Sequence, residues 1–143
     1  MRAGFVFVGL SMGFLGCGGG ADDGRVKVFP TQGKVLVSGR PAEGAKLTFY
    51  ASAADADGKK VPPPTGTADA AGVFHLETYK SADGAPPGDY KVTVVWLEPP
   101  PANAQGIFDL KDRLQGRYSS PDKTPLKAQI PDGGGEILPF ELK

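Results

Sequence analysis

Hydrophobic and polar residues alternate along most of the chain after residue 32, and this two-residue period is typical of β-strands. Segment 45–50 shows the pattern most simply, because Leu47 and Phe49 alternate with Lys46 and Thr48. We predict a strand here, with one face in the core and the other toward solvent. The same pattern predicts strands in five further segments: 33–39, 73–79, 89–96, 126–130 and 136–142.

Segment 89–96 is the strongest predicted strand, since it is dense in β-branched and aromatic residues. Its alternate residues are expected on the core face: Tyr90, Val92, Val94 and Trp96. Lys91 and Thr93 are expected on the other face. Trp96 lies on the same strand face as Val92 and Val94, and this favours a core position over the alternative role of stacking on a sugar ring.

A tight turn is predicted just before the strand at 73–79. We expect Asp69 to accept hydrogen bonds from backbone amides of its own turn, and Gly72 to adopt a positive φ. Phe74 would then enter the core two residues later. It would face Leu47 or Phe49, and Val92 or Val94, from the opposite sheet.

Two long segments carry no strand pattern and are predicted to be irregular. Segment 51–64 ends in the proline tract 62–64, which cannot form a central strand. Segment 98–125 begins with the prolines 99–101, and we expect one helical turn near residues 109–114. Both proline tracts could serve as polyproline II ligands for a partner, but stiffening of exposed loops explains them without one.

Composition and charge limit the fold and function classes. The chain has 143 residues, enough for one hydrophobic core, and its 21 glycines and 14 prolines lie largely between the predicted strands. Short strands separated by turns predict an all-β fold, a single Greek-key β-sandwich of about seven strands. The 16 Lys and Arg residues balance the 16 Asp and Glu residues, which argues against a nucleic-acid partner.

The first sixteen residues are typical of a signal peptide, because Arg2 precedes an apolar run shorter than the ~20 residues of a membrane span. The sequence Phe14-Leu-Gly-Cys17 that ends this run resembles the lipobox of bacterial lipoproteins. The resemblance implies that Cys17, the single cysteine, is diacylated and becomes the first residue of the mature chain. The alternative is an incidental cysteine in a leader cut elsewhere. We divide the chain into signal peptide 1–16, lipidated cysteine and flexible tether 17–31, and β-sandwich domain 32–143.

Motifs within the domain resemble carboxypeptidase regulatory-like domains. They are Gly33-Lys-Val followed by Gly39-x-Pro-x-x-Gly-Ala-x-Leu-x-Phe49, then Gly66-Thr-x-Asp-x-x-Gly-x-Phe74, then Pro87-Gly-Asp-Tyr-Lys-Val-Thr-Val94. The chain's end is similar to small planctomycete-type bacterial lipoproteins with one such domain, through Gly116-Arg-Tyr-Ser, Pro125-Leu and Leu138-Pro-Phe-x-Leu142. The resemblance implies a transthyretin-like (prealbumin-like) sandwich of seven strands. It does not imply peptidase activity, because these domains accompany the catalytic domain of the carboxypeptidases.

Candidate catalytic and metal-binding residues are sparse. His75, the single histidine, and Glu77 share a face of their predicted strand, but a catalytic zinc needs three protein ligands and no third is indicated. We interpret His75 as a solvated strand residue. The run Asp55-Ala-Asp-Gly58 is similar to the start of a calcium loop, but it lacks the remaining ligands and is better explained as a turn. We predict no enzyme activity, no cofactor and no metal.

These observations predict an exported, lipid-anchored β-sandwich on the periplasmic or cell-surface side of a bacterial membrane. Its expected role is adhesion, scaffolding or protein interaction, with an envelope protein as the partner. The alternative is a protein that binds a carbohydrate or small molecule through segment 98–125.

Overall fold

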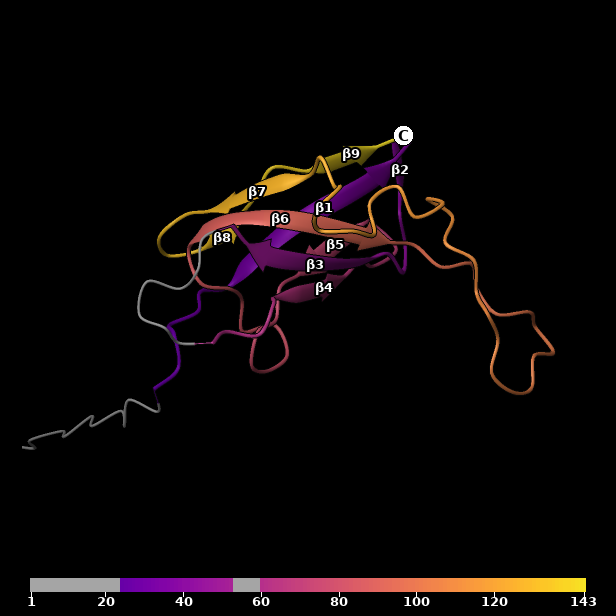
Figure 1. Ribbon diagram of the computed structural model, residues 1–143, viewed down its shortest axis with the longest axis horizontal. Helices are drawn as coiled ribbons and strands as arrows, with labels where there is room; N and C mark the ends of the chain where they lie inside the picture. The colour runs from indigo at the N-terminus through magenta and orange to yellow at the C-terminus, as the bar shows by residue number, and fades with distance from the viewer. Residues whose placement is uncertain (1–23, 53–59) are drawn as a thin grey trace, which may run out of the picture.

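The computed structural model describes residues 24–52 and 60–143, and within them the chain forms nine strands and no helix (Figure 1). The strands are β1 (Thr31–Val37), β2 (Arg40–Pro41), β3 (Lys46–Ala51), β4 (Thr65–Thr67), β5 (Val73–His75), β6 (Gly88–Val95), β7 (Lys127–Ile130), β8 (Gly135–Glu136) and β9 (Phe140–Leu142). The predicted all-β class is confirmed. Each of the six segments predicted from alternation overlaps at least one strand, and the extra strands are two or three residues long.

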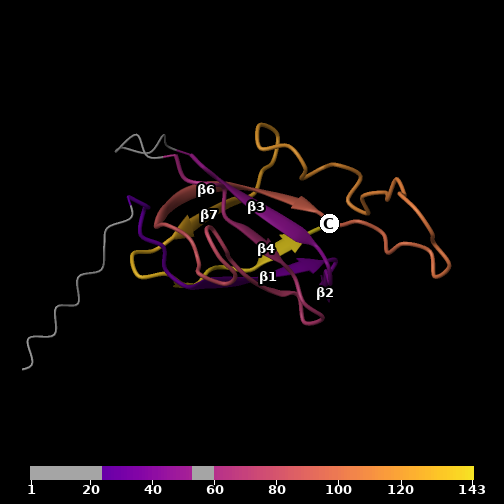
Figure 2. The same cartoon turned by 90° about the horizontal axis from the view of Figure 1, so that it is seen from below.

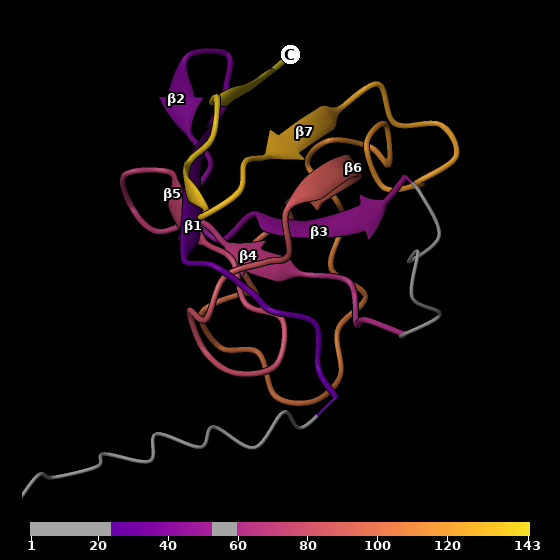
Figure 3. The same cartoon turned by 90° about the vertical axis from the view of Figure 1, so that its left-hand side faces the viewer.

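The strands form two sheets that lie as layers in the end-on view of Figure 3. One sheet has the order β4-β3-β6-β7 and is antiparallel throughout. In the other, β1 pairs antiparallel with β2 and β5 and parallel with β8 and β9. The predicted sandwich-like arrangement therefore holds, with β1 and β6 as long strands inside their sheets.

The predicted core faces agree with the observed burial. Leu47 and Phe49 are fully buried while Lys46 is exposed. In β6 the side chains of Tyr90, Val92 and Val94 are buried as expected, and Lys91 on the other face is exposed.

Thr93 departs from the expectation for the other face of β6, because its side chain is buried. The strand is flanked by β3 on one side and by segment 118–126 on the other. Val94 N–H donates to the Tyr118 carbonyl at 2.9 Å, and the Thr124 hydroxyl donates to the Val92 carbonyl at 2.7 Å. The Thr93 hydroxyl itself donates to the Thr48 carbonyl at 3.5 Å.

The aromatic centre of the core lies between the two sheets. The ring centroid of Phe49 is 6.1 Å from that of Phe74, 6.0 Å from that of Tyr90 and 6.2 Å from that of Phe140. Phe74 and Phe140 stack at 6.2 Å with an interplanar angle of 21°. The predicted contact of Phe74 with Phe49 is thus confirmed, and this cluster joins the two sheets.

The turn before β5 forms as predicted. The Asp69 carboxylate accepts hydrogen bonds from the N–H groups of Ala71 and Val73, each at 2.9 Å. Gly72 has φ 76°, and a Cβ at this position would lie 2.6 Å from the Val35 carbonyl oxygen. Only glycine fits at position 72 without displacement of the backbone near Val35. The turn therefore fixes the register in which Phe74 enters the core.

Strand β5 ends at His75, so the prediction of a strand over 73–79 was too long. Glu77 still pairs with Thr65 through two backbone hydrogen bonds of 2.8 and 2.9 Å. Beyond it the Asp83 carboxylate accepts from the N–H groups of Thr78, Tyr79 and Lys80, which turns the chain away from an extended path. Partial burial raises the pKa of Asp83, but these backbone hydrogen bonds outweigh burial and hold the pKa below its ordinary value.

Candidate functional site

The loop over residues 98–111 projects from one end of the sandwich, beyond the end of β6 (orange in Figure 1). Its base is closed by a bridge between Leu97 and Asp112 and by a hydrogen bond of 2.9 Å from Glu98 N–H to the Lys111 carbonyl. Pro99, Pro100 and Pro101 follow directly on one side of the base. The loop is therefore anchored at its stem.

Asp112 is the centre of this stem. Its carboxylate accepts hydrogen bonds from the N–H groups of Trp96 and Leu114, each at 3.0 Å, and of Gly116 at 2.9 Å. In a helix the N–H groups of Leu114 and Gly116 would donate to carbonyl oxygens four residues earlier, but here they donate to the Asp112 carboxylate. The helical turn expected at 109–114 does not form, and that prediction was wrong. Leu114 is instead buried in the core and holds the returning chain against the sandwich.

The tip of the loop carries exposed apolar side chains. Ile107 has a relative exposure of 104% and Phe108 of 41%. Sequence reasoning predicted the irregular segment but missed this pair. A signal was present, since Ile107 and Phe108 lie between Gly106 and Asp109 in a segment with no alternation that would bury them.

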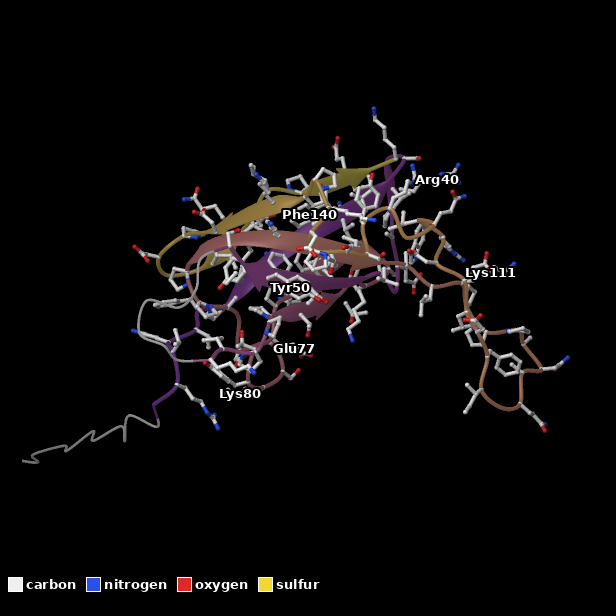
Figure 4. All side chains as sticks on the ribbon, in the orientation of Figure 1. Arg40, Tyr50, Glu77, Lys80, Lys111 and Phe140 are labelled. Atoms are coloured by element: carbon white, nitrogen blue, oxygen red, sulfur yellow. The ribbon has the colours of Figure 1, made fainter. Side chains whose placement is uncertain are left out.

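Trp96 lies at the base of the same loop and only partly follows its predicted core position. It is half-buried and packs against the core, and its indole N–H donates to the Glu43 carbonyl at 2.8 Å. The Arg113 guanidinium lies 4.6 Å from the ring centroid. A hollow of about 610 Å³ opens here, lined by Arg40, Pro41, Glu43, Gly44, Trp96, Leu97, Pro99 and Arg113. Figure 4 shows Arg40 and Lys111 at this end of the molecule.

An apolar groove of about 390 Å³ lies at the opposite end. Its walls come from the end of β3, the tract before β4, the start of β6 with the prolines before it, and a residue ahead of β1: Val26, Phe49, Tyr50, Ala51, Val61, Pro62, Pro63, Pro64, Pro86, Pro87, Gly88, Asp89 and Tyr90. The Pro64 carbonyl accepts from Phe49 N–H at 2.8 Å, and the Tyr90 hydroxyl donates to the Pro86 carbonyl at 2.8 Å. The proline tract at 62–64 is therefore part of the groove wall, docked along β3.

The residues considered for metal or nucleophilic chemistry do not form a cluster in the described structure. His75 and Glu77 are exposed, and within residues 24–52 and 60–143 no group of three His, Cys, Asp or Glu side chains is placed to hold a metal ion. Cys17 and the run Asp55-Ala-Asp-Gly58 lie outside the described residues. In the same described part of the chain, no helix has the length and apolarity needed to cross a membrane.

Comparison with known proteins adds no relative to this description. No protein-family model, no curated protein and no solved structure matches the chain. The resemblance to carboxypeptidase regulatory-like domains therefore rests on the motifs of the chain itself and stays a prediction.

Proposed function

We propose that this protein is a non-enzymatic, lipid-anchored module of a bacterial envelope that presents loop 98–111 to a protein partner. The observation that carries the proposal is the exposure of Ile107 and Phe108 at the tip of that loop. In Figures 1 and 2 the loop and the described N-terminal residues lie at opposite ends of the sandwich. A chain anchored through its N-terminus would hold the loop away from the membrane.

The physical form of the loop suits a binding element. Large apolar and aromatic side chains supply much of the free energy of protein association when a partner buries them. The stem bonds of Asp112 and the three prolines restrict the loop before binding, which lowers the conformational entropy lost on association. The proposal therefore places Ile107 and Phe108 in the centre of the interface.

The anchor in this proposal is Cys17. The lipobox-like sequence around it and the glycines at 18–20 support a lipid followed by a flexible tether. Two acyl chains give stable membrane attachment, whereas one gives only reversible binding. The motifs that resemble those of small bacterial lipoproteins with one carboxypeptidase regulatory-like domain support the same proposal.

Affinity capture from detergent-solubilised envelope, using the full lipidated protein, tests the proposed interface. We expect a partner captured by the wild type to be lost with Ile107→Asp/Phe108→Asp, since truncation of central interface residues commonly costs ~2 kcal/mol or more. Both side chains are exposed, so the change should alter folding stability little.

The matched control is Leu138→Asp, which alters an exposed apolar residue outside the loop (87% exposed). It should retain the partner. Equal capture by the wild type and the loop variant, or equal loss with Leu138→Asp, would contradict a role for the loop.

A second candidate function is binding of a carbohydrate or small molecule at the hollow beside Trp96. The observation in its favour is the position of the half-buried indole on the wall of that hollow together with Arg40 and Arg113. Trp96 is the single tryptophan of the chain, so its fluorescence reports on this place alone. Saturable changes in that fluorescence during titration with a soluble glycan panel would shift the assignment toward this function.

A further inference from the structure

The apolar groove is lined by the end of β3 and the start of β6. The described part of the chain begins at the same end of the sandwich (indigo in Figures 1 and 2). Val26 is itself part of the groove wall. Val26 follows Cys17 by nine positions, and nine extended residues span at most about 32 Å. A lipid on Cys17 would therefore keep the groove within that distance of the bilayer surface.

The chemistry around the groove is that of a surface that contacts lipid. The walls are built mainly from prolines, tyrosines and aliphatic residues, and Asp89 is the acidic residue among the described residues that line them. Cationic side chains flank the groove in sequence. Lys27 adjoins Val26, and the exposed Lys60 adjoins Val61. The Lys27 ammonium lies 5.0 Å from the ring centroid of Phe29, so it is held near this end of the molecule.

We propose that this groove face, with Lys27 and Lys60 at its rim, rests on the anionic bilayer in which the Cys17 lipid is inserted. The apolar rim enters the interface between headgroups and acyl chains, and the lysines contact lipid phosphates. The inference rests on the proposed function, because the tether supplies the high effective concentration that makes a small contact sufficient. It adds an orientation, with the groove toward the membrane and loop 98–111 away from it.

The orientation can be measured with single fluorescent labels on the acylated protein. The native cysteine is blocked by its lipid, so a cysteine introduced at an exposed site can be labelled alone. We compare Pro62→Cys at the groove rim with Ile107→Cys at the loop tip, each carrying an environment-sensitive NBD group. The protein is reconstituted into phosphatidylcholine vesicles with a minority of phosphatidylglycerol and a spin-labelled lipid as quencher.

We expect strong quenching at position 62 and little at position 107. Lys27→Glu/Lys60→Glu should lower the ratio of membrane-bound to unbound orientations by at least roughly 25-fold, because each lost lysine accounts for about fivefold and each glutamate adds repulsion. The control Arg40→Glu/Lys111→Glu, at the other end of the molecule, should leave the quenching at position 62 unchanged. Equal quenching of the two labels, or stronger quenching at position 107, would overturn the inference.

The intact mass of the same preparation separates this inference from the proposed anchor. An acylated protein whose label at position 62 is not quenched contradicts the orientation and leaves the anchor standing. If acyl groups are absent, the anchor fails, and co-flotation of the protein with the same anionic vesicles decides the inference. Flotation that Lys27→Glu/Lys60→Glu abolishes supports the groove face as a lipid-binding surface, and a lack of flotation contradicts it.

Discussion

Replacement of Phe74 by alanine is expected to lower the free energy of unfolding by about 3–5 kcal/mol. The ring of Phe74 is fully buried and contacts Phe49 of the other sheet and Phe140 of its own. Its removal leaves a cavity at the contact between the sheets, and the cost is a large share of the ~5–15 kcal/mol available to a domain of this size. Denaturant titration of the wild type and the variant measures the difference.

His75→Ala is the matched control for Phe74→Ala. His75 is the next residue in β5 and its side chain is exposed, so the expected change is within about ±0.5 kcal/mol. A larger loss for His75→Ala than for Phe74→Ala would show that the assigned inward face of β5 is wrong.

Gly33→Ala should destabilise the protein by about 1–3 kcal/mol, because the added methyl group overpacks the core. A Cβ at this position would lie 2.6 Å from Cζ of Phe74 and 2.9 Å from Cγ1 of Ile137. The glycine in β1 thus makes room for the aromatic ring that β5 supplies. The free energy of unfolding from denaturant titration gives the cost, and Lys34→Ala, an exposed neighbour on the same strand, serves as the control.

A double-mutant cycle tests whether Phe74 is the cause of that cost. In a Phe74→Leu background the atom nearest to the new methyl group is gone, so Gly33→Ala should cost less than it does in the wild type. We expect a coupling free energy of about 0.5–3 kcal/mol between the two positions. Additive effects would contradict direct contact as the reason for glycine at position 33.

The parts of the fold that sequence reasoning predicted well are those set by local chemistry. Alternation at 45–50 and 89–96 identified the residues that face the core, because burial on one face of a strand has a period of two. The Asp69 turn was predicted with its hydrogen-bond acceptor and its positive φ. Asp side chains commonly accept hydrogen bonds from nearby backbone amides in turns, and glycine adopts a positive φ without steric cost.

The errors arose where one side chain binds backbone from another part of its loop. Asp83 shortens the predicted strand at 73–79, and Asp112 replaces the helical turn expected at 109–114. Each of the two carboxylates accepts hydrogen bonds from three backbone N–H groups. A sequence shows that such a residue is present but not which amides it will reach. A third difference is Thr93, which alternation assigned to the outer face of β6 and whose side chain is buried.

The candidate surfaces could be predicted only in part. Segment 98–125 was predicted to be irregular. The exposure of Ile107 and Phe108 was not predicted, because it depends on the bridge between Leu97 and Asp112, beyond which the loop projects from the core. The groove was not predicted, because it joins four segments that are distant in sequence: Val26, the end of β3, the prolines at 62–64 and the start of β6. Its assembly depends on how the tract 62–64 docks along β3.

The chemical state of Cys17 in the mature protein tests the central claim of a lipid-anchored module most directly. Intact-mass and peptide mass spectrometry of the protein from native membranes should show a chain that begins at Cys17 and carries acyl groups on that residue. Metabolic labelling with a fatty-acid probe should mark the wild type and not Cys17→Ser, which should also leave the membrane fraction. A mature N-terminus at any other residue, or equal labelling of Cys17→Ser, would contradict the claim.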